Sequence, residues 1–122
     1  MGSIPMTRGD IVLVELEPVQ GSEANERRPA VIVSHDALNT VVARRRHGVL
    51  TVVPLSTNVA RVWSFQVLLP AEITGLAQDS KAQAEQVRAL AYERFAPTRI
   101  ASLPPAYVER LDAALRLHLA LG

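Results

Sequence analysis

The 122-residue chain contains no cysteine, which excludes disulfide bonds and cysteine-ligated metal or cluster sites. This absence fits a reducing compartment, so we expect the protein to act in the cytoplasm. The apolar runs are far shorter than the ~20 residues that a membrane-spanning helix needs. The first residues lack the cationic and apolar pattern of a secretory signal. We therefore expect no membrane association.

Lysine is almost absent as well. Twelve of the 13 basic residues are arginine, and Lys81 is the exception. Arginine is the better bidentate ligand for phosphate, although a GC-rich genome, which favours arginine codons, explains the excess at least as well. The net charge of +1 produces no strong overall field.

Metal and cofactor chemistry find little support in the sequence. The histidines His35, His47 and His118 are far apart, and none has the spacing of a zinc-binding helix. The chain has no glycine-rich phosphate loop and no nucleophile elbow. We expect neither a metal ion nor a cofactor.

The hydrophobic pattern predicts one mainly β domain over residues 1–122. A further strand or a helical turn is expected at 87–91, and Pro54 should mark an edge or a bulge because it has no N–H to donate. Residues 1–7 are expected to be disordered or a cloning remnant, with Met6 as an alternative initiator. Strand patterns occur at 9–16, 30–34, 49–55, 65–69, 80–84 and 94–100.

The C-terminal segment, 103–121, predicts a helix instead. Ser102 can cap it, and the first turn tolerates the two prolines at 104 and 105. Five or six short, mostly antiparallel strands with one late helix indicate a small barrel or a strongly bent sheet. The predicted helix is amphipathic, because leucines and valine recur every three or four residues at Val108, Leu111, Leu115 and Leu119.

Three polar groups follow or precede the predicted strands. A long charged loop, 21–29, joins the first two strands, where an ordinary hairpin needs only about two to five residues. Such loops tend to carry binding and chemistry. The three groups are Glu23, Arg27 and Arg28 in the loop; Ser56, Thr57 and Asn58 after the third strand; and Gln83, Glu85 and Arg88 farther along.

These residue types fit cleavage of RNA without a metal. A carboxylate can take the proton of the ribose 2′-hydroxyl, while an arginine and hydroxyl groups hold the phosphate as charge builds. Ordinary structural roles remain open for each: Arg28 at the start of a strand, 56–58 as a turn, and Glu85 as a solvated residue. Trp63, beside Arg61, could stack on a base or pack in the core. We expect 44–47 to be a loop, either a solvated charge run or a phosphate contact.

In the order and spacing of its segments, the chain resembles the MazF/PemK family of toxin endoribonucleases. The stretch 17–23 followed by 28–34 is similar to the family's D-P-x-x-G-S-E and R-P-x-V-V-V-S signature, which is the most specific part. Other matching segments are Arg8-Gly9-Asp10-Ile11-Val12, Val53-Pro54-Leu55-Ser56-Thr57-Asn58, Phe65-Gln66-Val67-Leu68-Leu69 and Glu85-Gln86-Val87-Arg88-Ala89-Leu90.

This resemblance implies an SH3-like β-barrel with a C-terminal helix, acting as a homodimer. It implies metal-independent, sequence-specific cleavage of single-stranded mRNA that leaves a 2′,3′-cyclic phosphate and a 5′-hydroxyl. It also implies a cognate antitoxin whose disordered tail occupies the RNA groove.

Carried over residue by residue, the resemblance assigns Arg28 to the catalytic arginine and Glu23 to an acidic position that some members use. Ser56 falls where threonine is usual, and Glu85 where many members have aspartate. Gln83 replaces a second catalytic arginine of PemK-type members, which shifts weight to Arg28 and Glu23. Together these assignments make Arg28, Glu23 and Ser56 the catalytic candidates, and Thr57, Asn58, Glu85, Gln83, Arg88, Trp63 and Arg27 the RNA-binding candidates.

Two alternatives stay open at this point. The same fold includes toxins that bind gyrase without catalysis and use a C-terminal tryptophan beside glycine, whereas this chain ends Leu121-Gly122. A nucleic-acid-binding barrel without turnover is the other alternative. The base also stays open among Glu23, Glu26 and Glu85.

Overall fold

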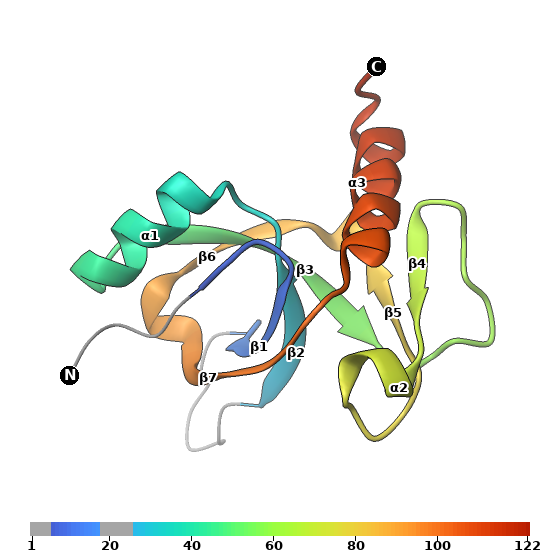
Figure 1. Cartoon of the computed structure of the whole chain (residues 1–122), viewed down its shortest axis with the longest axis horizontal. Coiled ribbons are helices and arrows are strands. Elements are labelled where there is room, and N and C mark those ends of the chain that lie inside the picture. The colour runs from blue at the N-terminus through green and yellow to red at the C-terminus, as the bar shows by residue number, and fades with distance from the viewer. Residues whose placement is uncertain (1–5, 18–25) are drawn as a thin grey trace.

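The computed structural model describes residues 6–17 and 26–122. Within these ranges the chain forms seven strands, three α-helices and two 3₁₀ turns (Figure 1). In chain order these are β1 (Asp10–Glu15), β2 (Arg27–Ile32), α1 (Asp36–Arg45), β3 (Val49–Ser56), β4 (Gln66–Leu69), α2 (Ala71–Thr74), β5 (Ser80–Gln83), a 3₁₀ turn (Ala84–Gln86), β6 (Arg88–Ala91), a 3₁₀ turn (Tyr92–Arg94), β7 (Phe95–Ser102) and α3 (Pro105–Leu119).

The strands form one bent sheet in the order β4-β5-β3-β2-β1-β7, with β6 paired to β3. Every pairing is antiparallel. The prediction of a mainly β fold with a C-terminal helix is confirmed, and residues 88–91 of the segment 87–91 form strand β6. The number of strands differs, because the described residues form seven strands rather than five or six. Of the two expected forms, a small barrel or a strongly bent sheet, the open bent sheet is the one found, since β4 and β7 do not pair with each other.

The central strands β1 and β2 bury apolar residues on both faces, as their sequences predict. Alternation sends Ile11 and Val31 into a core beneath α3, while Val12, Val14 and Ile32 enter a second core beneath α1. Burial on both faces explains why β2 reads as an uninterrupted apolar run from Ala30 onward. In Figure 1 the two helices lie over different parts of the sheet, with α3 on the β4–β5 side.

Strand β2 begins earlier than the sequence predicts. Arg27 and Arg28 pair with Glu15 and Val14 of β1, so they belong to the strand and not to the preceding loop. Pro29 pairs with β1 only, because the ladder to β3 starts at the next residue. A residue without an N–H fits such a one-sided position.

Pro54 lies at a break in the sheet, as predicted. On one edge of β3, residues 49–52 pair with β6 and residues 55–56 pair with β5. The 3₁₀ turn Ala84–Gln86 joins β5 to β6 and leaves Pro54 without a partner on that edge. The strand nevertheless continues to Ser56, which places Ser56 against β5.

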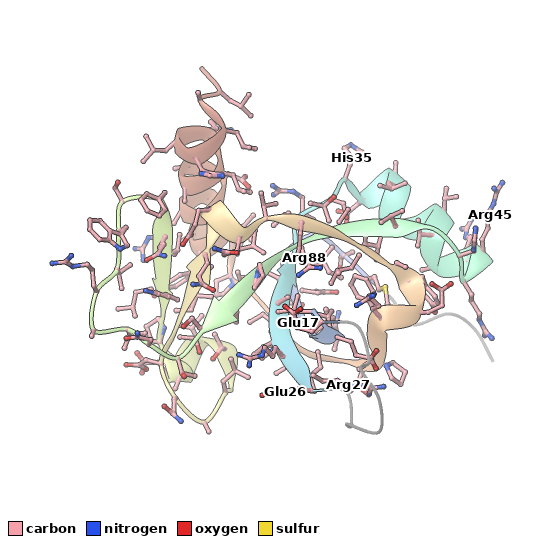
Figure 2. The ribbon with its side chains drawn as sticks, turned by 180° about the vertical axis from the view of Figure 1, so that it is seen from behind. Glu17, Glu26, Arg27, His35, Arg45 and Arg88 are labelled. Atoms are coloured by element: carbon pink, nitrogen blue, oxygen red, sulfur yellow. The ribbon has the colours of Figure 1, made fainter. Side chains whose placement is uncertain are left out.

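Helix α1 was not predicted, and the expectation of a loop at 44–47 is wrong for its first half. Arg44 and Arg45 form the last turn of the helix, where cations interact favourably with the helix dipole. The helix ends at Arg46, whose φ of 52° is left-handed, and the chain turns at Gly48, whose φ is 120°. Figure 2 shows Arg45 projecting outward at this end of the molecule.

Helix α3 agrees with the prediction except at its ends. Ser102 does not cap it; this residue is the last of β7, and its hydroxyl donates to Asp10. Pro104 is the N-cap, with no side-chain hydrogen bond. Leu111 is buried, but Leu119 is 49% exposed, so the last turn leaves the core.

The start of the described chain belongs to the folded domain. Met6 is buried in the core beneath α1, and the backbone N–H and hydroxyl of Thr7 both donate to Asp10. No described helix is long and apolar enough to cross a membrane.

Candidate active site

A pocket of about 240 Å³ opens where β2, β3 and β5 meet. Arg28 and Pro29 of β2 form one wall, and the end of β3 forms another. Its lining residues are Leu16, Arg28, Pro29, Pro54, Leu55, Ser56, Thr57, Ser80 and Gln83. Three of the residue groups singled out in the sequence therefore contribute to one hollow, although they are up to 55 positions apart.

The pairing of β2 with β3 explains how Arg28 and Ser56 come to share a face. Ala30 is opposite Pro54, and alternation places Arg28 and Ser56 two positions along from these partners, on the same side of the sheet. The Arg28 side chain is 56% exposed, so its guanidinium can meet a ligand from solvent. Arg27, the next residue, faces the opposite side and lies 3.7 Å from a carboxylate oxygen of Glu15.

One described carboxylate contacts Arg28. Glu26 Oε2 lies 3.3 Å from Arg28 Nη2, and both side chains are largely solvated. Figure 2 shows Glu26 and Arg27 at the start of β2, with Glu17 and Arg88 over the middle of the sheet. Glu23 lies outside the described residues.

Ser56 lines the pocket and also forms a hydrogen bond within the turn that follows β3. Ser56 lines the pocket with Thr57, and its Oγ also accepts a hydrogen bond from the Asn58 backbone at 3.2 Å. The stretch 56–58 is therefore a turn and a pocket wall together. Asn58 directs its side-chain oxygen to Ala60 N, at 3.4 Å, and does not line the pocket.

Glu85 is not among the residues that line this pocket. It lies in the 3₁₀ turn after β5, where its Oε2 accepts a hydrogen bond of 2.7 Å from Gln66 Nε2. Its other oxygen is buried without a hydrogen-bond partner among the described residues. This carboxylate links β4 to the turn after β5.

Of the remaining candidates, one lines the pocket and two lie outside its lining. Gln83 lines the pocket, whereas Arg88 is exposed on β6, opposite Val52. Trp63 lies on the loop between β3 and β4, outside the pocket lining, and is 48% exposed.

Five lining residues were not among the predicted site residues: Leu16, Pro29, Pro54, Leu55 and Ser80. Leu16 closes the end of β1, and Ser80 begins β5, whose register beside β3 could not be read from the sequence.

The arrangement is suited to binding an anion. A guanidinium presents paired N–H donors, and the Ser56 and Thr57 hydroxyls add neutral donors beside it. In the described part of the chain, no group of three or more His, Asp or Glu side chains gathers where it could hold a metal ion. An arginine that shares a pocket with hydroxyl groups can stabilise a phosphate that gains charge in a transition state.

Comparisons with known proteins agree over nearly the whole chain. A family model described as "PemK-like, MazF-like toxin of type II toxin-antitoxin system" matches residues 7–119. A Mycobacterium tuberculosis protein named Endoribonuclease MazF9 is 52% identical over 116 residues, covering 95% of this chain and 98% of the relative. The Escherichia coli protein named Endoribonuclease toxin MazF is 28% identical over 109 residues, or 89% of each chain.

The fold has solved counterparts. A crystal structure of MazE-MazF from Deinococcus radiodurans matches with a TM-score of 0.75 and 24% identity, over 98% of both chains. The family model, the 52% identity and the shared fold lead to one conclusion: this chain belongs to the PemK-like, MazF-like toxin family of type II toxin–antitoxin systems.

Proposed function

We propose that this chain is an endoribonuclease that cleaves single-stranded mRNA at short sequences, without a metal ion. The observation that carries the proposal is the exposed Arg28 guanidinium beside the hydroxyls of Ser56 and Thr57 in one pocket. The full-length likeness to proteins named endoribonuclease supports it.

The proposed reaction is an attack within the RNA backbone. The ribose 2′-oxygen forms a bond to phosphorus while the bond from phosphorus to the 5′-oxygen breaks. A base takes the 2′-hydroxyl proton, and the departing 5′-oxygen takes a proton from solvent. The products are a 2′,3′-cyclic phosphate and a 5′-hydroxyl.

Arg28 holds the phosphate oxygens in this scheme. The hydrogen bonds from its charged N–H groups become stronger as negative charge develops on the phosphate, which lowers the activation barrier to cleavage. Ser56 and Thr57 position the same oxygens, and Gln83 contributes an amide to the wall. These residues bind and orient, and none of them needs to change its own charge.

We assign the base to Glu26 among the described carboxylates, because it contacts Arg28. Glu85 is less suited to this role, because it accepts a hydrogen bond from Gln66 and does not line the pocket. Glu23, which the resemblance favours, remains a second carboxylate of the same connection and can be tested alongside Glu26.

The partners follow from the family. We infer that a cognate antitoxin inhibits the enzyme by covering the RNA groove, that the toxin acts as a homodimer, and that it acts in the cytoplasm. Solved structures that contain both MazE and MazF support an antitoxin partner.

Substitution of Arg28 tests the proposal. Loss of one transition-state donor costs about 2.7–4 kcal/mol, so Arg28→Ala should slow cleavage by about 10²–10³-fold. Arg28→Lys keeps the positive charge but lacks the paired N–H donors of a guanidinium, so it should recover only part of the cleavage rate. Arg116→Ala, which removes an exposed arginine on α3, is the matched control and should leave cleavage unchanged.

The assay measures cleavage of a single-stranded RNA in EDTA, with circular dichroism to confirm folding. Near-normal cleavage by Arg28→Ala would remove the arginine from the mechanism. A parallel pair, Glu26→Gln and Glu23→Gln, identifies the base: the variant that loses the acidic limb of the pH–rate profile carries the carboxylate that must be ionised.

A further inference from the structure

The loop between β3 and β4 carries a stack of three side chains that the cleavage pocket does not use. The guanidinium carbon of Arg61 lies 4.7 Å from the centre of the Trp63 ring. The Trp63 and Phe65 rings are nearly parallel, at 5°, with centres 6.1 Å apart. Arg61 and Phe65 thus each lie against the Trp63 ring, and we call these three side chains the stack.

This stack is held in place from below. The buried Lys81 of β5 donates from Nζ to the Arg61 carbonyl oxygen at 2.8 Å. Gln66 holds the Trp63 backbone by two hydrogen bonds. The Gln66 backbone N–H donates to the Trp63 carbonyl oxygen, and the Gln66 side-chain oxygen accepts from the Trp63 backbone N–H. Glu85 in turn holds the Gln66 amide. The only lysine of the chain and the half-buried carboxylate of Glu85 therefore fix this loop.

Anchoring of this kind leaves the stack itself open to solvent. Trp63 is 48% exposed, although burial would be the ordinary fate of a lone tryptophan. Arg61 forms no ion pair within the described ranges, so its charge is available for a ligand. An exposed ring in contact with a guanidinium that forms no ion pair in the described ranges is complementary to an unpaired base and its phosphate.

The stack also lies on the same connection as the pocket. Thr57 lines the pocket, and Arg61 follows four residues later. Four residues span at most about 14 Å, which is a reach of a few nucleotides. A strand cleaved at Arg28 can therefore continue along this loop.

We propose that Arg61, Trp63 and Phe65 form a second RNA contact that stacks one unpaired base flanking the cleaved bond. The inference rests on the proposed endoribonuclease function for its substrate class. It adds a binding site outside the Arg28 pocket and assigns a task to Lys81 and Gln66, which position the stack and do not touch RNA.

The chain provides its own reporter, because Trp63 is its only tryptophan. The probe is a random-sequence pool of short single-stranded 2′-O-methyl RNA, which lacks the attacking hydroxyl and cannot be cleaved. We expect saturable quenching of Trp63 emission in the wild-type protein. In a fluorescence-polarisation assay of labelled probe, Trp63→Ala should bind about 5- to 150-fold more weakly, whereas Trp63→Tyr should retain most of the affinity.

Two controls separate stacking from loop damage. Val62→Ala removes an exposed apolar side chain from the same loop and should bind normally. On cleavable RNA, Trp63→Ala should raise KM with little change in kcat, because the base is held equally in the ground and transition states. A damaged fold would lower kcat as well.

The outcomes are distinct. Unchanged Trp63 emission with equal Kd for wild type and Trp63→Ala would overturn the proposal. It would also be overturned if emission changed with protein concentration alone, because Trp63 would then lie between copies of the chain. Quenching by the probe without cleavage of natural RNA would support the stack and reject the endoribonuclease proposal instead.

Discussion

The buried carboxylate of Asp10 provides a stability test of the fold that holds the site. It lies at the start of β1 and is 1% exposed. Its Oδ2 accepts hydrogen bonds from Thr7 N at 2.9 Å and Thr7 Oγ1 at 2.8 Å, and its Oδ1 accepts one from Ser102 Oγ at 2.7 Å. Arg99 Nη1 lies 3.7 Å from Oδ2. One side chain thus joins the N-terminal segment to β7.

The size of the stability loss on removing the Asp10 carboxylate follows from these contacts. Hydrogen bonds to a charged group contribute about 1.5–3 kcal/mol each, so three give at least about 4.5 kcal/mol before correction. Thr7 and Ser102 are exposed and can bond to water once the carboxylate is removed. We therefore expect Asp10→Ala to lower the free energy of unfolding by about 3 kcal/mol.

Urea unfolding followed by circular dichroism measures this loss. With an m-value of about 1–3 kcal/mol/M, the midpoint should fall by about 1–3 M. Asp79→Ala is the control, because this exposed carboxylate accepts a single bond, from Ala71 N at 2.8 Å; it should cost about 1 kcal/mol. A loss below about 0.5 kcal/mol for Asp10→Ala would refute the reasoning, since it would mean that water replaces all three bonds at no cost.

Two further predictions concern the stability of the fold. Gly48→Ala should lower the free energy of unfolding by about 1–3 kcal/mol, because φ is 120° and an added Cβ would lie 3.0 Å from Val42 Cγ2. Gly75→Ala is the control and should lower it less, because φ is 74° and no atom lies within 4 Å of the added Cβ. Equal losses in thermal unfolding would contradict the steric argument. Glu85→Ala should lower the unfolding midpoint and loosen β4, seen as faster amide exchange at Gln66, because the Gln66 amide loses its acceptor; an unchanged midpoint together with unchanged exchange would show that this bond contributes nothing.

The strands were predictable because local pattern and tertiary burial agree in them. Val12 and Val14 alternate with Ile11 along β1, and each residue enters the core that its face dictates. Pro54 was informative for the same reason, since a missing N–H restricts where a strand can pair.

Helix α1 was hidden because its local signals are weak. It contains the β-branched residues Thr40, Val41 and Val42, which favour strands. Its cap is His35, whose Nδ1 accepts from Ala37 N at 3.0 Å, and histidine is not a usual N-cap. Asp36 in the first turn and the arginines of the last turn were the signals that could have revealed it.

The candidate site was predictable in part. Arg28 and Ser56 line the same pocket, because the β2–β3 pairing brings them to one face. Glu85 could not be judged from spacing, since its partner Gln66 is 19 positions away and joins it only through the β4–β5 hairpin. The Arg61–Trp63–Phe65 stack likewise depends on the anchoring bond from Lys81, which no local pattern reveals.

The most direct test of the central claim is primer extension on a long mRNA after incubation with the purified protein in EDTA. The account predicts discrete stops that share a short sequence, with a 2′,3′-cyclic phosphate on the upstream fragment and a 5′-hydroxyl on the downstream one. Absence of stops at every protein concentration, or stops that appear only when a divalent metal is added, would contradict it.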